Sequence, residues 1–302
     1  MSTKGYGPGM DGPTGARVLP DLDERQFAQW NDLLERRTGM VIPFTRRSFL
    51  STNLRLRMRE LGCSDYQAYY ERVSDPAAVE EWTVLVDRLT VHETRFFRHP
   101  NSFRLVATLA LQERPGLPAE NRPFLAWSVG CATGEEPYTL AMVLEDSQRR
   151  HGLEISYSVV GTDISLPALR TAKRGRYPVG RLAGIEPRFR SRYCRACGEK
   201  HFELSKALRA QVCFSQANVL DLDRAPFTGL DLIYCQNLLI YFDRRQRERI
   251  MNGLVERLAP GGVLLLGPGE LAGWSCTGMQ RIRFEDVLAY RRVTASAAKE
   301  TQ

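Results

Sequence analysis

The spacing of apolar side chains changes once along this chain, near residue 90. Over residues 21–89 they recur every three or four positions, the period of an α-helix with one buried face. The segment "DERQFAQWNDLLERRTGM" is an example, because Phe27, Trp30 and Leu34 fall on one side and Gly39 ends the pattern. Three further segments have the same period. We therefore predict a small all-α domain over residues 21–89.

After residue 100 the apolar positions form short continuous runs that alternate with helical segments. These runs are "RPFLAWSVGC", "EISYSVVGTDIS", "LDLIYCQNLLIYF" and "VLLLGPGE". Strands of this kind are typical of parallel sheets with helices on both faces. Residues 101–293 are therefore predicted to form an α/β domain, with an antiparallel β insertion at about 190–214, where the pattern breaks. The other parts are predicted to be a disordered leader (1–20), a junction (90–100) and a tail (294–302).

The first α/β strand ends in a glycine turn, "VGCATGEEP", after which two carboxylates open the next helix. In a doubly wound sheet, ligands bind beyond the carboxyl ends of the strands, where helix N-termini present free N–H groups. Glu135 and Glu136 would repel a phosphate there, so a ligand with a cationic group is favoured over a dinucleotide. The alternative is a plain strand–helix turn whose acidic residues suit the helix dipole.

More polar side chains stand near the predicted ends of strands. Asp163 closes the second strand, where an acidic residue accepts hydrogen bonds from both ribose hydroxyls of a nucleoside. Its alternative role is to cap the next helix, for which Ser165 is better placed. Asn218 stands within reach of an adenine ring, and Asn237, four residues before Tyr241, either caps a turn or holds a ligand. Ribose, adenine and a cationic amino group together indicate S-adenosylmethionine.

Several motifs, in order along the chain, resemble those of the CheR family of chemoreceptor glutamate methyltransferases over residues 22–290. They are "LTVHETRFFR", "WSVGCATGEEPYTLAM", "VGTDIS", "ANVLD" and "CQNLLIYFDRRQRERIMNGLVERLAPGGVLLLGPGE". The resemblance implies a Rossmann-like S-adenosylmethionine-dependent methyltransferase domain with a small antiparallel β insertion, preceded by a small all-α N-terminal domain. It also implies transfer of a methyl group from S-adenosyl-L-methionine to glutamates of methyl-accepting receptors, which leaves S-adenosyl-L-homocysteine.

The resemblance implies roles for the residues that match the family's motifs. Tyr241 is expected to position the substrate carboxylate, and Arg98 to neutralise it. The family usually has asparagine where this chain has His92, and arginine where it has Gln236, so contacts at both positions are expected to differ. These departures suggest a divergent branch, such as one serving a type IV pilus chemosensory system. The expected cofactor contacts are His92, Thr94, Arg98, Glu136 at the methionine amino group, Asp163 at the ribose, Asn218 and Val219 at the adenine, Gln236 and Asn237.

Two aromatic residues, Phe96 and Phe97, stand between Thr94 and Arg98 in the junction. Rings of this size bury a large apolar area when they are packed. We therefore expect Phe96 and Phe97 to pin the helical domain to the α/β domain, while Thr94 and Arg98 face the cofactor from the junction.

The chain is basic, with 42 Lys+Arg against 35 Asp+Glu and a formal net charge of +7. This balance favours an anionic partner, which by charge alone is a nucleic acid, a membrane surface or an acidic protein. Arg55, Arg57 and Arg59 lie together on the second helical segment. They form either a solvated helix face or, as the resemblance implies, a surface that docks on acidic receptor helices. The arginines form no tail of the kind that binds nucleic acid, and no apolar run approaches the roughly 20 residues of a membrane span.

The insertion carries further features that bear on partners. In some members of the family this subdomain grips the C-terminal pentapeptide of a receptor, but here it is shorter, so no such tethering is expected. Cys194, Cys197 and His201 form C-x2-C-x3-H, which with Cys213 would make a zinc site. Isolated reduced thiols are the preferred interpretation, and no metal is expected. Scattered cysteines and the lack of an apolar signal segment indicate the cytoplasm.

Two alternative functions share the same cofactor site. One is a methyltransferase acting on another substrate, such as a nucleic acid or a small molecule. The other is a signalling adaptor that binds S-adenosylmethionine and catalyses nothing, which the departures at His92 and Gln236 make conceivable.

Overall fold

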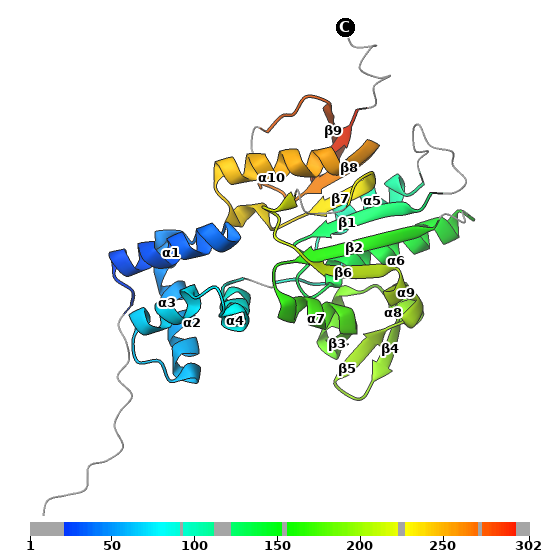
Figure 1. Cartoon of the computed structure of the whole chain (residues 1–302). Coiled ribbons are helices and arrows are strands. Elements are labelled where there is room, and N and C mark those ends of the chain that lie inside the picture. The colour runs from blue at the N-terminus through cyan, green and yellow to red at the C-terminus, as the bar shows by residue number, and fades with distance from the viewer. Residues whose placement is uncertain are drawn as a thin grey trace, which may run out of the picture.

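The computed structural model of the chain describes residues 21–90, 93–111, 122–152, 156–222, 227–270 and 274–293. The predicted leader and tail, and His92, lie outside the described residues. Within these ranges the chain forms a helical domain followed by an α/β domain that carries a small second sheet (Figure 1). The predicted fold class is confirmed.

The helical domain packs its helices around a core of its own. Asp23 and Gln26 form a capping box at the start of the first helix, and Gly39 ends that helix in a left-handed conformation. Trp30 and Tyr69 lie in this core, with ring centroids 5.6 Å apart. The elements are α1 (Glu24–Thr38), η1 (Phe44–Arg46), α2 (Arg47–Leu61), α3 (Tyr66–Ser74) and α4 (Val79–Leu89).

The main sheet has the strand order β6-β2-β1-β7-β8-β10-β9. The strands from β6 to β8 in this order are parallel, and β10 and β9 are antiparallel at one edge. The chain moves outward from β1 to β2 and β6 and then returns to β7, so the order reverses between β1 and β7. A reversal of this kind opens a crevice at the carboxyl ends of the two strands. The strands are β1 (Phe124–Val129), β2 (Tyr157–Asp163), β6 (Val212–Gln216), β7 (Leu230–Cys235), β8 (Leu258–Leu266), β9 (Met279–Phe284) and β10 (Val287–Arg292).

Both faces of the central parallel strands are buried. Along β7, Leu232 and Tyr234 belong to one core cluster, while Ile233 and Cys235 belong to another. Helices α5 and α6 contribute to the first cluster and α10 to the second (Figure 1). This explains the continuous apolar runs in the sequence, because alternate residues of one strand meet different helices. The helices are α5 (Pro100–Leu109), α6 (Glu135–Arg150), α7 (Leu166–Arg174) and α10 (Arg244–Arg257).

A second, antiparallel sheet with the order β3-β5-β4 lies in the insertion. The predicted range of about 190–214 contains its hairpin but not its first strand, which begins at Arg176. The strand that starts at Val212, expected in the same hairpin, instead pairs in parallel with β2 at the edge of the main sheet. The elements are β3 (Arg176–Pro178), η2 (Val179–Gly184), α8 (Pro187–Tyr193), β4 (Cys194–Cys197), β5 (His201–Leu204) and α9 (Lys206–Ala210).

The expectation that Phe96 and Phe97 pin the helical domain is wrong. The ring of Phe96 packs on Tyr177 and Phe202 of the small sheet, at centroid distances of 5.1 and 6.2 Å. The ring of Phe97 stacks on Phe189 of α8 at 5.0 Å. Aromatic rings gain most from burial against other rings, and here the insertion supplies them. The two phenylalanines therefore hold the junction to the insertion.

Other contacts join the helical domain to the α/β domain. Helix α4 lies against α7, and Asp87 accepts a hydrogen bond from the hydroxyl of Ser165. At the end of α1, Gly39 packs closely on the side chains of Leu220 and Phe242. Among the described helices, none is both long enough and apolar enough to cross a membrane.

Candidate functional site

Two adjoining pockets lie at the carboxyl ends of β1, β2 and β7, in the crevice that the strand order creates. They share Gly130, Ala132, Asn237 and Tyr241 as lining residues, so they are parts of one site. The first pocket contains Asp163, Asn218 and Val219 of the predicted cofactor contacts, together with Thr38, Met40 and Thr90 of the helical domain. The second contains Thr94, Arg98, Glu136 and Gln236. The structure thus brings the predicted contacts that it describes into one crevice.

The glycine turn holds the loop after β1 close to its neighbours. Gly134 has a φ of 93°, and a Cβ atom there would lie 2.7 Å from the Cβ of Ala172 on α7. Its neighbour in the turn, Ala132, donates its backbone N–H to the Asp163 carboxylate at 2.8 Å. The tight turn therefore ties the ends of β1 and β2 together at the floor of the site.

Asp163 is 9% exposed and sits at the end of β2. One carboxylate oxygen accepts from the N–H of Ala132 and the other from the N–H of Ser165, each at 2.8 Å. The cap of α7 is Ser165, whose side chain accepts from the N–H of Ala168, so Asp163 is not used as a cap. Two backbone donors fix the orientation of this carboxylate in the wall of the first pocket.

The structure separates the two neighbouring carboxylates of the glycine turn. Glu135 points away from the lining: it accepts from the hydroxyl of Thr133 at 2.6 Å and lies 3.9 Å from the Nε of Arg181. Glu136 lines the second pocket and accepts from the hydroxyl of Ser128 at 2.7 Å. Burial raises the pKa of Glu136 to about 8. A carboxyl in this state regains its charge when a cation binds beside it.

The junction segment forms the wall opposite the glycine turn. Thr94 lines the pocket, while its carbonyl accepts a hydrogen bond from Arg181 of the insertion. The guanidinium of Arg98 folds back and donates to the carbonyl of Glu93. Phe97 has a φ of 53°; Arg98, which follows it, lines this pocket, whereas the partly buried ring of Phe97 packs on Phe103 and Phe189.

The turn after β7 carries Asn237 and Tyr241 into both pockets. Asn237 has a φ of 59°, and its side-chain oxygen lies 3.1 Å from the Nε2 of His99. Glu270, which is 2% exposed, accepts from the backbone N–H of Leu239 at 3.1 Å. The sequence motifs did not point to His99, Glu270 or Ser128. The roles of His99 and Glu270 depend on contacts with distant segments, whereas Ser128 lies in the glycine-turn motif itself, eight positions before Glu136.

Gln236 is 5% exposed, and its amide group is engaged inside the protein. Its Nε2 donates to the hydroxyl of Ser102 and to the carbonyl of Leu266, both at 3.0 Å. Its Oε1 accepts from the hydroxyl of Tyr234 at 2.9 Å. With both donors used, Gln236 stabilises the end of β7 next to the pocket that it lines.

The three arginines of the predicted docking surface differ in their surroundings. Arg57 donates to both oxygens of the buried Glu81, at 3.0 and 2.7 Å, and also to Glu60. Arg55 pairs with Asp21 at 3.2 Å. Arg59 is exposed and forms no ion pair within the described parts of the chain. Arg57 thus stabilises the helical domain, and Arg59 presents its charge to solvent.

The candidate zinc ligands are only partly brought together. Cys197 and His201 are paired across the β4–β5 hairpin, and Cys213 is exposed on β6 of the main sheet. No group of three or more His, Cys, Asp or Glu side chains with metal-binding geometry occurs among the described residues.

The strand order, the glycine turn after β1 and the acidic residue that ends β2 define an α/β protein of the class that binds S-adenosylmethionine. Residues 25–90 match the model of the CheR methyltransferase all-alpha domain, and residues 92–282 match that of the CheR methyltransferase SAM binding domain. The chain therefore belongs to the CheR methyltransferase family, and the resemblance noted in the sequence is confirmed.

Similar proteins carry two kinds of name. The chain is 35% identical to "Probable biofilm formation methyltransferase WspC" of Pseudomonas putida over 92% of this chain and 63% of that protein. A protein of the same name from Pseudomonas aeruginosa is 33% identical, over 87% of this chain and 61% of that one. The "Chemotaxis protein methyltransferase" of Klebsiella aerogenes is 32% identical, over 84% and 86%. The chain thus spans less than two thirds of the two WspC proteins.

Proposed function

We propose that this protein transfers a methyl group from S-adenosyl-L-methionine to glutamate side chains of methyl-accepting chemotaxis-type receptors. The products are glutamate methyl esters and S-adenosyl-L-homocysteine, and the reaction takes place in the cytoplasm. The observation that carries the proposal is the meeting of Asp163, Glu136 and Tyr241 in one connected crevice. The family match and the names of the relatives support the same activity.

The two pockets suit the two ends of S-adenosylmethionine. In the first, Asp163 accepts hydrogen bonds from the ribose hydroxyls, and Asn218 and Val219 contact the adenine. In the second, the Glu136 carboxylate pairs with the methionine amino group. Thr94, Arg98 and Asn237 complete the contacts, and Gln236 acts by holding its strand end in place. The contact expected at His92 lies outside the described residues and stays a prediction.

Methyl transfer requires little acid–base chemistry from the protein. S-adenosylmethionine supplies an electrophilic methyl group, and a glutamate oxygen forms a bond to it as the carbon–sulfur bond breaks and its electron pair moves to sulfur. The attacking carboxylate is already ionised at neutral pH, so no general base is needed. Tyr241, which lines both pockets, positions this carboxylate, and Arg98 compensates its charge. Alignment is therefore the main contribution of the protein.

The helical domain supplies the proposed receptor-binding surface. Arg59 and, more weakly, Arg55 present positive charge on α2, which suits an acidic helical region of a receptor. Leu56, 45% exposed between them, adds an apolar contact. The absence of pentapeptide tethering by the small sheet, and service in a type IV pilus system, stay predictions.

The test measures transfer of labelled methyl groups from S-adenosylmethionine to a methyl-accepting receptor. The labelled receptor is then treated with alkali. Glutamate methyl esters release labelled methanol in base, whereas methylated nitrogen keeps its label. Base-stable label would contradict the proposal in favour of another substrate. Bound cofactor without any transfer would point to an adaptor.

Tyr241→Phe is the matched variant, because it removes one hydroxyl and keeps the ring. We expect methanol release to fall roughly 10–100-fold through misplacement of the carboxylate. Affinity for S-adenosylhomocysteine, measured by calorimetry, should stay close to that of the wild type. Equal loss of affinity and rate would mean that Tyr241 serves the cofactor and not the substrate.

A further inference from the structure

The proposed function leaves a third pocket unused. This pocket lies between α5, α6 and α8, and Phe97 of the junction contributes to its wall. Its volume is about 680 Å³. Pockets that hold small molecules typically measure about 300–1,000 Å³ and combine apolar walls with a few polar groups. The size therefore suits an organic molecule rather than a single ion.

The walls of this pocket are largely apolar and aromatic. Phe97, Phe103 and Phe189 come together there, with Phe97 stacked on Phe189 and edge-on to Phe103 at 5.7 Å. Val143 of α6 and Leu111 beyond the end of α5 extend this surface. Phe103 and Phe189 are only 4% and 3% exposed, so a ligand buries apolar area mainly on the partly exposed Phe97, Ala107 and Leu111.

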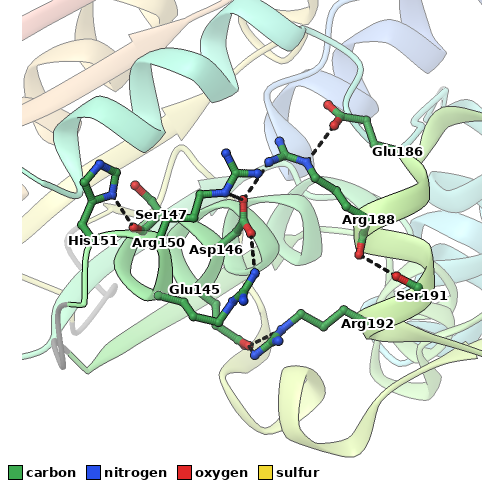
Figure 2. A network of polar contacts seen from close by, with 10 residues as sticks. Glu145, Asp146, Ser147, Arg150, His151, Glu186, Arg188, Ser191 and Arg192 are labelled. Carbon is green, nitrogen blue, oxygen red and sulfur yellow. Dashed lines mark hydrogen bonds and ion pairs between the residues drawn. The ribbon is translucent and has the colours of Figure 1, made fainter.

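In the lining of the pocket, one buried carboxylate pairs with several guanidinium groups. Figure 2 shows the head groups of Arg150 and Arg188 meeting at Asp146, which is 7% exposed. Both arginines lie 3.0 Å from the same oxygen of Asp146, and Arg149 lies 3.2 Å from the other oxygen. Arg188 also reaches Glu186 at 2.8 Å. Asp146 thus fixes two arginine side chains that line the pocket.

These arginines keep hydrogen-bond donors for a further partner. Arg150 uses only its Nε for Asp146, and its two terminal nitrogens have no partner among the residues that the structure describes. The side chains of Arg150 and Arg188 are 50% and 44% exposed. The lining contains three arginines, Arg104 being the third, against the two carboxylates of Asp146 and Glu186; Arg104 pairs with Glu285 beside the pocket, which leaves Arg150 as the arginine whose two terminal nitrogens are both unused. The charge of the lining therefore suits an anion.

We propose that this pocket, which we name the α5–α8 pocket, binds a small organic anion. The ligand has an apolar body that lies against Phe97, Ala107 and Leu111, which are partly exposed in the pocket, and a carboxylate, phosphate or sulfonate group that Arg150 and Arg188 bind. Guanidinium groups recognise such anions with paired N–H donors. The proposal does not depend on the receptor being the methyl acceptor.

The α5–α8 pocket also shares a wall with the cofactor site. Phe103 lines both, and Phe97 directly precedes Arg98, which lines the cofactor side. The left-handed backbone at Phe97 fixes the relation between these two side chains. An occupant that moves either ring therefore changes the second cofactor pocket, so the proposed anion is an effector of cofactor binding.

The direct test uses 8-anilinonaphthalene-1-sulfonate, an aromatic anion that fluoresces when it leaves water. The full chain is titrated in saturating S-adenosylhomocysteine, so that the cofactor pockets are filled. We expect saturable binding of one probe molecule, weakened about fivefold by Arg150→Gln, since a charge-assisted hydrogen bond at a half-exposed site is lost. Asp146 keeps Arg149 and Arg188 in this variant, so the fold is retained, which a thermal melt confirms.

The matched control is Arg192→Gln. Arg192 lies on α8 like Arg188 and pairs with Glu145 of α6 at 3.0 Å, but it does not line the pocket (Figure 2). Loss of this ion pair should leave probe affinity unchanged. N-phenyl-1-naphthylamine, which lacks the sulfonate, should bind more weakly and be insensitive to Arg150→Gln. Equal effects of Arg150→Gln and Arg192→Gln, or equal binding of the two probes, would overturn the proposed anion site.

The effect of the bound anion on the cofactor site is measured through the affinity for S-adenosylhomocysteine. Calorimetry of S-adenosylhomocysteine binding, with and without saturating 8-anilinonaphthalene-1-sulfonate, should give different affinities, and Arg150→Gln should reduce the difference. Reciprocity requires the probe's own affinity to change by the same factor when the cofactor site is filled. Identical cofactor affinities in both conditions would overturn the effector role.

Discussion

Glu136 is the residue whose chemistry depends most on its surroundings. It shares the glycine turn with Glu135, and the sequence cannot distinguish the two. In the structure, Glu135 is turned toward Thr133 and Arg181, whereas Glu136 faces the second pocket with Ser128 as its polar partner. Burial raises the pKa of Glu136 to about 8, so without a ligand this carboxyl is mostly neutral at pH 7.

We predict that binding of S-adenosylhomocysteine at pH 7 releases close to one proton from wild-type protein. The ammonium group of the ligand restores the charge of Glu136 and lowers its pKa from about 8. Calorimetry in two buffers of different ionisation enthalpy measures this release. Glu136→Gln should bind more weakly and release no proton. Identical heats in both buffers for the wild type would contradict the prediction.

The Glu136 carboxyl also affects the stability of the ligand-free protein. Its pKa is about 8 when folded, against 4.5 for an unperturbed glutamate, so between these values the folded state retains a proton that the unfolded chain has lost. This contribution to stability is therefore complete below about pH 4.5 and lost as pH rises through about 8. Glu136→Gln should raise the melting temperature of the ligand-free protein at pH 8 relative to wild type, the reverse of its effect on binding.

At the residue level, the sequence allowed a side chain to be placed in the crevice where it stands at or just after the end of a strand. Asp163, Asn218 and Asn237 could be placed in this way, because parallel strands bring their carboxyl ends to one edge. The partners His99 and Glu270 could not, since each reaches the turn after β7 from another segment. Spacing along one segment contains no information about such contacts.

At the scale of elements, helices and buried strands were predictable and the insertion was only partly so. Strand β7 is an uninterrupted apolar run because both of its faces are covered. Strand β6 lies at the edge of the main sheet, and only Val212 of its residues is buried, so its sequence resembles that of an exposed hairpin. Strand β3 has three residues, too few for a periodic signal.

Helix α2 has one face that stabilises the domain and another that faces solvent. Arg59→Glu places a reversed charge on the solvent side, and we expect it to raise the KM for receptor about fivefold, more at low salt than at high salt. S-adenosylhomocysteine affinity should not change. Kinetics at two ionic strengths measure the effect. A KM equal to wild type at low salt would exclude Arg59 from the docking surface.

Two variants serve as controls for that prediction. Arg36→Glu reverses an exposed charge on α1, where Arg36 pairs with Asp32 at 2.7 Å, and should leave the receptor KM unchanged. Arg57→Glu places a carboxylate against the buried Glu81 and should lower the free energy of unfolding by about 3 kcal/mol, measured by urea denaturation. Its loss of activity would therefore reflect the fold, which separates Arg57 from Arg59.

At the scale of the whole molecule, the helical domain forms part of the cofactor site. Thr38, Met40 and Thr90 line the first pocket, although the sequence suggested only receptor docking for this domain. The side of the domain that meets the site was not predictable, because Phe96 and Phe97 turned toward the insertion instead. We therefore predict that contact between the two domains is needed for full affinity for the cofactor.

Gly39 tests this dependence, with Gly62 as its matched control. Both glycines end helices of the helical domain in the left-handed conformation, with φ values of 77° and 69°. A Cβ atom at Gly39 would lie 1.9 Å from the Cδ1 of Leu220 and 3.3 Å from the ring of Phe242, whereas one at Gly62 would meet nothing within 4 Å. The left-handed backbone makes alanine cost about 1 kcal/mol of stability at either position, and the contact with Leu220 adds to this cost at Gly39 alone.

Only Gly39→Ala should also weaken binding of the cofactor. Leu220 follows Val219, the expected adenine contact, and Phe242 lines the first pocket. We expect Gly39→Ala to weaken S-adenosylhomocysteine binding about tenfold, or about 1.4 kcal/mol, while Gly62→Ala binds like wild type. Calorimetry below the melting temperature of both variants measures the difference. If the two variants bind equally well, the α/β domain forms the site without help, and the helical domain serves the receptor alone.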